Sequence, residues 1–318
     1  MPAVRIGVPD LVSPSYFPII AAVELGHVAD EGIDAQIELT FPVTDAAGML
    51  SRGELDLLGG AAHAPLYGFP GWQGVRLAAA LSQNMYWFLV ARKDLSVERG
   101  DLSALSECRI GAAPGVREGL IALFEAYGID LKASGIEVVG VPGATGADVS
   151  FGVAAARALA EGRLDAFWAN GMGAHVAVLD GTGTVVVDAR RDENPGRHFT
   201  FPALAVSEHT IESRPEVVRG VIRALVRAQN ELAADPSCAT TVGKRLFPNR
   251  EAKLISELVQ RDAPFYDPAI SVEALASLQA FAGKIGILDS PRGYGDVVAT
   301  QYVDLWAEHK PAANRDNR

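Results

Sequence analysis

The chain has 318 residues, 49% hydrophobic and 21% charged, which is enough to bury one large core or two medium ones. Its formal net charge of -11 opposes binding to a nucleic-acid backbone or an anionic membrane, and no cluster of Lys and Arg offsets it. No apolar run is long enough for a transmembrane helix.

The first part of the chain is predicted to form a β-α-β-α-β unit. Apolar spacing predicts strands at 5–8, 35–41 and 55–61, with helices at 16–25 and 46–53. The first helix is expected to end at Gly26.

The same order of elements follows a second time. Strands are predicted at 109–111, 136–141 and 164–169, and helices at 116–127 and 153–162. The two units begin at Arg5 and Arg109 and are nearly equal in length, so a duplicated architecture is predicted.

A short motif, L-x-x-G-x-L-D, ends at Asp56 in the first unit and at Asp165 in the second. The first Leu is expected to pack the last helical turn on the sheet, the Gly to form a left-handed cap, and the second Leu to begin a buried strand. The motif is therefore interpreted as a helix-to-strand connector rather than a catalytic carboxylate. Ligands of open parallel sheets bind beyond the carboxyl ends of the strands, so the loops there are the candidate site.

Four runs, RIGVPDLVSPSYFPIIAAVELG, GMLSRGELDLLGGAAHAP, RIGAAPGVREGL and ALAEGRLDAFWANG, occur in this order. Together they resemble type II periplasmic solute-binding proteins of ABC transporters, in the sulfonate, nitrate, taurine and thiamine-pyrimidine (NMT1/THI5-like) family. The resemblance implies an α/β fold with two lobes, each a mostly parallel sheet flanked by helices. It places lobe 1 at 1–88 and 202–318 and lobe 2 at 89–201, joined by crossover strands at 84–94 and 198–207 that form a hinge.

The remainder of the chain, from residue 208, is predicted to form amphipathic helices that cover lobe 1. Apolar residues recur there at helical spacing: Val217, Val218, Val221, Ile222 and Leu225.

In lobe 1, the loop after the first strand contains Ser13, Ser15 and Tyr16 at the start of a helix. Hydroxyl and free N–H groups there are suited to an anionic group, and ordinary helix capping by either Ser is the alternative. His63 is the first polar side chain after the third strand and is a candidate ligand contact, with a structural His as the alternative. Phe41, at the end of the second strand, is a further candidate.

In lobe 2, Arg117 stands in the first turn of a helix, where a bound carboxylate or sulfonate would offset its unfavourable position. A solvated Arg117 is the alternative. Alignment of the two units sets Met172 opposite His63, with Trp168 and Asn170 beside it; Trp168 is also consistent with the core. Phe151 or Ser150 is expected near the cleft.

An aromatic lining is predicted where the hinge passes the cleft. Tyr86 and Trp87 lie in one crossover and Phe201 in the other, and flat ligands would stack on them. A buried strand between lobes would need similar residues, so the pattern also fits a structural role.

Several site types have no support in the sequence. Cys108 and Cys238 lack the spacing of a zinc site or disulfide framework, and the six histidines show no H-x-x-x-H pairing. The run GVPGATGADVSFG lacks the ending of a phosphate-binding loop, and G-x-S-x-G is absent. No metal and no cofactor are expected.

Two functions are weighed. The first is a binding protein for a small anionic or aromatic solute, such as a sulfonate, carboxylate or pyrimidine, which it delivers to the permease of an ABC importer. The second is an enzyme on the same fold, a decarboxylase or dehydratase, with His63, Asp10 and Tyr86 as acid or base candidates. The family implies a periplasmic or cell-envelope location, whereas no leader precedes the first strand, which leaves the cytoplasm open. A monomer is expected.

Overall fold

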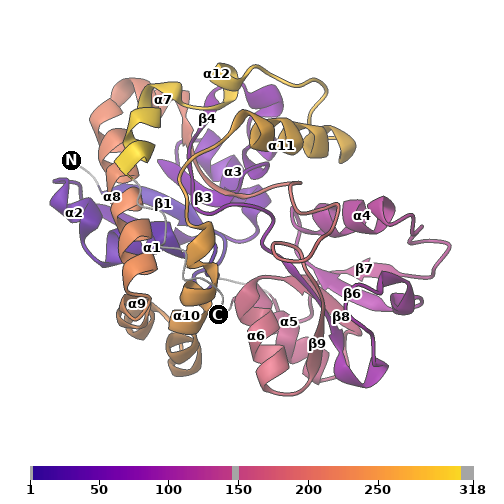
Figure 1. The fold of residues 1–318 in the computed structure, drawn as a ribbon. Coiled ribbons are helices and arrows are strands. Elements are labelled where there is room, and N and C mark those ends of the chain that lie inside the picture. Colours follow the sequence, from indigo (N-terminus) through magenta and orange to yellow (C-terminus); the bar gives the residue numbers. More distant parts are fainter. Residues whose placement is uncertain (1–2, 145–149, 309–318) are drawn as a thin grey trace.

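The computed structural model describes residues 3–144 and 150–308. It contains two five-stranded sheets, each flanked by helices, in two lobes that lie side by side (Figure 1). The α/β class and the two-lobed, type II architecture predicted from the sequence are confirmed. Part of the glycine-rich run at 140–152 falls outside the described residues.

The first lobe is built on a sheet with the strand order β2-β1-β3-β10-β4. Strands β1 and β2 are parallel, as are β1 and β3, whereas β10 runs antiparallel to both of its neighbours. The elements of this lobe are β1 (Val4–Val8), α1 (Phe17–Glu24), α2 (His27–Asp30), β2 (Ala35–Leu39), α3 (Val43–Ser51), β3 (Leu57–Ala61), β4 (Val75–Ala80) and β10 (Pro202–Ser207).

The second lobe repeats this arrangement with the strand order β7-β6-β8-β5-β9. Here β5 is the strand that runs against its neighbours. The elements are β5 (Phe88–Arg92), β6 (Arg109–Ala112), α4 (Arg117–Ala126), β7 (Glu137–Val139), α5 (Phe151–Ala160), β8 (Ala166–Ala169), α6 (Gly171–Leu179) and β9 (Gly183–Asp188). The duplication predicted from the sequence is therefore present in the strand order itself.

The repeated L-x-x-G-x-L-D motif makes the same connection in both lobes. Gly53 and Gly162 have left-handed backbones, with φ of 70° and 67°. Asp56 accepts a hydrogen bond from the backbone N–H of Arg5 at 2.7 Å, and Asp165 accepts one from that of Arg109 at 3.0 Å. Each Asp thus holds the start of its strand to the start of a parallel neighbour, β1 in the first lobe and β6 in the second, at the edge of the sheet opposite the strands' carboxyl ends.

The chain passes between the lobes twice, at 81–87 and at 189–201. Neither passage is a regular strand. The predicted crossover strands begin later, as β5 and β10, because each enters its sheet only after crossing. The lobe boundaries at 88/89 and 201/202 stay a prediction.

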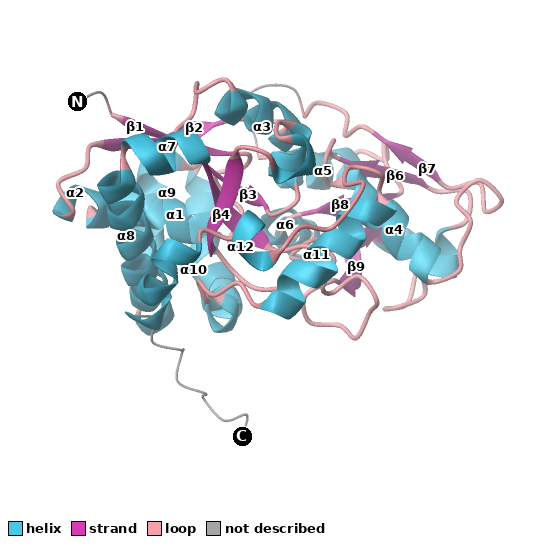
Figure 2. Cartoon of the chain, turned by 90° about the horizontal axis from the view of Figure 1, so that it is seen from above, coloured by secondary structure: helices cyan, strands magenta, loops and turns pink. Residues whose placement is uncertain are grey.

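The C-terminal helices are α7 (Glu208–Ser213), α8 (Pro215–Ala234), α9 (Cys238–Leu246), α10 (Asn249–Asp262), α11 (Val272–Lys284) and α12 (Tyr294–Val297). Helix α8 packs on α1 and α2, with Val218, Val221, Ile222 and Leu225 buried. These helices do not cover the first lobe alone: Lys284 of α11 donates to the carbonyl of Ala122 in α4. Figure 2 shows α11 extending towards α4.

Short 3₁₀ helices lie at Ala64–Tyr67, Pro70–Trp72, Lys93–Leu95, Leu102–Leu105, Ala263–Phe265 and Thr300–Glu308. Among the helices in the described part of the chain, none is long and apolar enough to cross a membrane.

Candidate functional site

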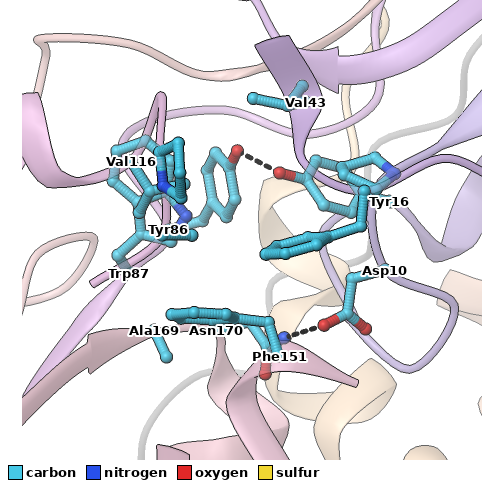
Figure 3. Close-up of a pocket in the computed structure, with 13 residues that line it drawn as sticks. Asp10, Tyr16, Val43, Tyr86, Trp87, Val116, Phe151, Ala169 and Asn170 are labelled. Carbon is cyan, nitrogen blue, oxygen red and sulfur yellow. Dashed lines mark hydrogen bonds between the residues drawn. The ribbon is translucent and has the colours of Figure 1, made fainter. Parts of the chain in front are cut away.

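A cavity of about 40 Å³ lies between the lobes, beyond the carboxyl ends of the strands. Figure 3 shows its walls, which come from both lobes and from the first passage between them. The lining residues are mostly apolar or aromatic: Pro9, Asp10, Tyr16, Phe41, Val43, Tyr86, Trp87, Ala113, Pro114, Val116, Phe151, Ala169 and Asn170.

The aromatic walls are held by contacts with one another. The hydroxyls of Tyr16 and Tyr86 share a hydrogen bond of 2.5 Å, and the Tyr86 ring lies 4.8 Å from that of Trp87. Phe41 of the first lobe stacks on Phe151 of the second with ring centroids 5.7 Å apart. Burial raises the pKa of both tyrosines above the ordinary value, so both hydroxyls are protonated at neutral pH.

Asp10 bridges the two lobes at the floor of the cavity. Its carboxylate accepts from the Ser150 hydroxyl at 2.8 Å and from the Asn170 side-chain amide at 2.7 Å, and both donors precede helices of the second lobe. It also accepts from the backbone N–H of Val12 at 2.9 Å. Burial raises the pKa of Asp10 to about 6.

His63 makes a second bridge outside the cavity. Because a carbonyl only accepts, its Nε2–H donates to the Gly115 carbonyl of the second lobe at 2.9 Å. Its Nδ1 then accepts from the Thr200 hydroxyl at 3.0 Å. Burial lowers the pKa of His63 to about 4, so the ring is neutral at pH 7 and links the lobes in one tautomer.

Of the residues predicted from the sequence, those that line the cavity are Tyr16, Phe41, Tyr86, Trp87, Phe151 and Asn170. The structure does not bring the remaining seven to the cavity wall: Ser13, Ser15, His63, Arg117, Trp168, Met172 and Phe201.

Apart from His63, described above, six of these residues lie elsewhere. Ser13 is fully buried, and the Ser15 hydroxyl donates to Asp262 at 3.5 Å. Arg117 is exposed at the start of α4 and does not line the cavity. Trp168 packs behind the wall, its ring edge-on to that of Trp87, and the other two are buried in the cores of their lobes: Met172 and Phe201.

Asp10 lines the cavity, although the sequence analysis named it only as an acid or base candidate for an enzyme and not as a ligand contact. It is the first charged side chain after β1, as His63 is the first polar side chain after β3, so the same strand-end signal identifies both. Within residues 3–144 and 150–308, no group of three or more His, Cys, Asp or Glu side chains is placed to hold a metal ion.

A comparison with known protein families shows which family the chain belongs to. The model of the family described as "NMT1/THI5 like" matches residues 13–239. The chain belongs to the NMT1/THI5-like family. The resemblance seen in the sequence is therefore confirmed, although no curated protein sequence matches this family member.

Solved structures share the fold of this NMT1/THI5-like chain. A protein of Bordetella bronchiseptica RB50 matches with a TM-score of 0.73 and 19% identity, over 96% of this chain and 97% of that one. The alkanesulfonate-binding protein SsuA of Xanthomonas axonopodis pv. citri, bound to MOPS, gives 0.70 and 16%, over 95% and 98%. DSZB, crystallised with biphenyl-2-sulfinic acid and described elsewhere as a desulfurization enzyme, gives 0.62 and 18%, over 94% and 97%. The fold thus serves both solute-binding proteins and an enzyme.

Two residues bridge the lobes, His63 and Asp10. Between about pH 4 and 6, their titration is expected to change the free energy of unfolding in opposite directions. The pKa of His63 falls from 6.5 to about 4 on folding, so the unfolded chain binds the proton more tightly and stability rises with pH. The pKa of Asp10 rises from 3.8 to about 6, so the folded chain binds the proton more tightly and stability falls as the pH rises.

Urea unfolding at several pH values tests this pair. Relative to the unsubstituted protein, His63→Gln should shift the slope of stability against pH downwards across this window, and Asp10→Asn should shift it upwards. Parallel pH profiles for all three proteins would contradict the assignment.

Proposed function

We propose that the protein binds one small organic solute between its lobes and delivers it to the permease of an ABC importer, working in the periplasm or cell envelope. The observation that carries the proposal is the cavity itself, whose walls come from both lobes. A solute there contacts both halves at once, so it binds the closed form more tightly than an open one and shifts the population towards closure.

The hydrogen bonds across the cleft support a closing mechanism. Asp10 with Ser150 and Asn170 forms one bridge, and His63 with Gly115 the other. Both depend on the lobes lying close together, and both would break when they separate. A cavity of about 40 Å³ has room for only a few non-hydrogen atoms, since one water needs about 10–15 Å³. The solute, or the part of it that is enclosed, is therefore small.

The lining favours an aromatic site over an anion site. Among the described residues that line the cavity, none is Lys, Arg or His, and Asp10 is the acid. A sulfonate or carboxylate would meet this carboxylate in a weakly solvated space with no cation to pair with. The sequence left both anionic and aromatic solutes open, and the lining favours a solute that packs on aromatic rings.

Ligand-dependent stability tests the proposed function. A library of ammonium compounds, pyrimidines, aromatic acids and sulfonates is screened by urea unfolding. A true solute at 100 times its dissociation constant should add about 2.7 kcal/mol.

Matched variants locate the effect. The added stability should be lost in Phe151→Ala, whose ring lines the cavity, and should persist in Phe199→Ala, whose ring stacks on Phe281 outside it. A library without any stabilising member, or equal loss in both variants, would refute binding in this cavity.

A lyase is the second candidate function. The observation that favours it is a carboxyl group, Asp10, with a pKa raised to about 6 in the cavity, where it is able to exchange a proton near neutral pH. A decarboxylase or dehydratase would convert a cyclic or aromatic acid, and Asp10→Asn would abolish turnover without abolishing binding. Product formation from candidate acids, followed by mass spectrometry, separates this function from simple binding.

A further inference from the structure

The cavity is walled by aromatic rings on several sides. Tyr16 approaches Tyr86 edge-on with centroids 5.4 Å apart, Trp87 lies next to Tyr86, and the stacked pair of Phe41 and Phe151 closes another side. Figure 3 shows Tyr16, Tyr86, Trp87 and Phe151 around one common space. The face of an aromatic ring carries negative potential and attracts organic cations, most strongly when the cation is desolvated.

A single carboxylate completes this wall, and its charge is not paired. The side chains that donate to Asp10, Ser150 and Asn170, are both uncharged. Burial raises the pKa of Asp10 only to about 6, so the group is ionised at pH 7.5. The cavity therefore holds a negative charge inside an aromatic enclosure.

Positive charge exists nearby but faces away from the cavity. The guanidinium of Arg190 lies 6.0 Å from the centre of the Tyr86 ring and does not line the cavity. It donates to Asp262 at 2.8 Å and to the Ser82 hydroxyl at 2.7 Å. Arg190 is thus paired with its own carboxylate and leaves Asp10 available to a ligand charge.

We infer that the solute is a small organic cation, with an ammonium group enclosed by the aromatic rings and set beside Asp10. This inference rests on the proposed function and specifies its solute class. A methylated ammonium group suits the site better than a primary amine, because its methyl groups need no hydrogen-bond acceptors and the faces of the rings offer none. Its few non-hydrogen atoms also match the small enclosed volume.

Three compounds of nearly the same shape test the charge requirement directly. Choline is a cation, 3,3-dimethylbutan-1-ol is its uncharged counterpart, and 3,3-dimethylbutanoate is an anion. Titration calorimetry at pH 7.5 should show choline binding about tenfold or more tightly than the alcohol, from the cation–π and carboxylate attraction together. The anion should show no binding.

Two variants identify the source of the preference. Asp10→Asn should reduce the affinity for choline by about tenfold or more and leave that for the alcohol within about twofold. Asp304→Asn, the same change at an exposed acid, should leave both affinities unchanged. Lowering the pH through about 6 should weaken choline binding and not alcohol binding, because Asp10 takes up a proton. The comparison of the three compounds uses the unsubstituted protein, so it does not depend on the folding of any variant.

The outcomes separate this inference from the proposed function. Equal binding of choline and the alcohol, or preference for the anion, overturns the ammonium inference and leaves a solute-binding protein in place. Absence of choline binding likewise overturns it, whichever library compound stabilises the protein. If no compound of any class stabilises the protein, the proposed function fails as well.

Discussion

Asp262→Asn is expected to lower the free energy of unfolding by about 3–5 kcal/mol, the cost of removing one partner from a buried ion pair. Three guanidinium groups donate to the Asp262 carboxylate: Arg190 at 2.8 Å, Arg191 at 2.7 Å and Arg261 at 3.2 Å. Arg190 and Asp262 are almost completely buried. The amide of Asn keeps the shape of the side chain but leaves the charge of Arg190 without compensation.

The effect should depend on pH in a defined direction. Burial alone would raise the pKa of Asp262. The neighbouring Arg190, Arg261 and Arg191 together lower the pKa by more than burial raises it, so it stays below its usual value. A lowered pKa gives a contribution that is present at neutral pH and is lost as the pH falls through the pKa of the folded state. The difference between Asp262→Asn and the unsubstituted protein should therefore shrink in acid.

An exposed ion pair provides the control. Glu54→Gln removes the partner of Arg52 at 2.7 Å, where both side chains are about half exposed, and should leave the urea midpoint unchanged. A similarly small effect of Asp262→Asn would show that the ion pairs of Asp262 do not stabilise the folded protein.

The buried cluster formed by Asp262 with Arg190, Arg191 and Arg261 also explains why the site has its shape. It connects the end of α10 at Asp262 with both passages between the lobes, through Arg190 in the second and Ser82 in the first. The guanidinium of Arg190 lies against the Tyr86 ring, which is part of the cavity wall. The aromatic wall is therefore positioned from behind by an ionic network, and loss of Asp262 is expected to weaken solute binding as well as stability.

The sequence predicted the duplicated fold because the signals for it are local. Apolar periodicity places strands and helices, and the L-x-x-G-x-L-D motif marks the turn from helix to strand at Gly53 and Gly162. Both carboxylates of the motif hold backbone N–H groups of neighbouring strands, as a connector should. These features depend on residues close in sequence or on one repeated pattern, so they are readable without a structure.

The site was less predictable because it depends on which way each side chain turns. Strand-end position indicated the correct loops, and Tyr16, Phe151 and Asn170 do reach the cavity. The same reasoning does not show that His63 turns towards Gly115 instead. The buried cluster joins Ser82, Arg190 and Asp262, which are distant in sequence, so no local pattern could reveal it.

Gly173→Ala is expected to cost about 2–3 kcal/mol of unfolding free energy and to weaken solute binding. A Cβ at Gly173 in α6 would lie 2.3 Å from the carbonyl oxygen of Gly152 in α5, and 2.7 Å from its Cα. Backbone cannot rotate away as a side chain can, so α5 and α6 have to separate. The starts of these two helices carry Ser150 and Asn170, which hold Asp10.

Gly140→Ala is the matched control, because nothing lies within 4 Å of a Cβ built there, and it should change stability by less than about 0.5 kcal/mol. Urea unfolding measures the stability, and titration with the solute found by the library screen measures the affinity. If Gly173→Ala lost stability but kept full affinity, the spacing of α5 and α6 would be a packing requirement alone. Loss of both would show that close contact between two glycines sets the position of the donors to Asp10, and through it the floor of the cavity.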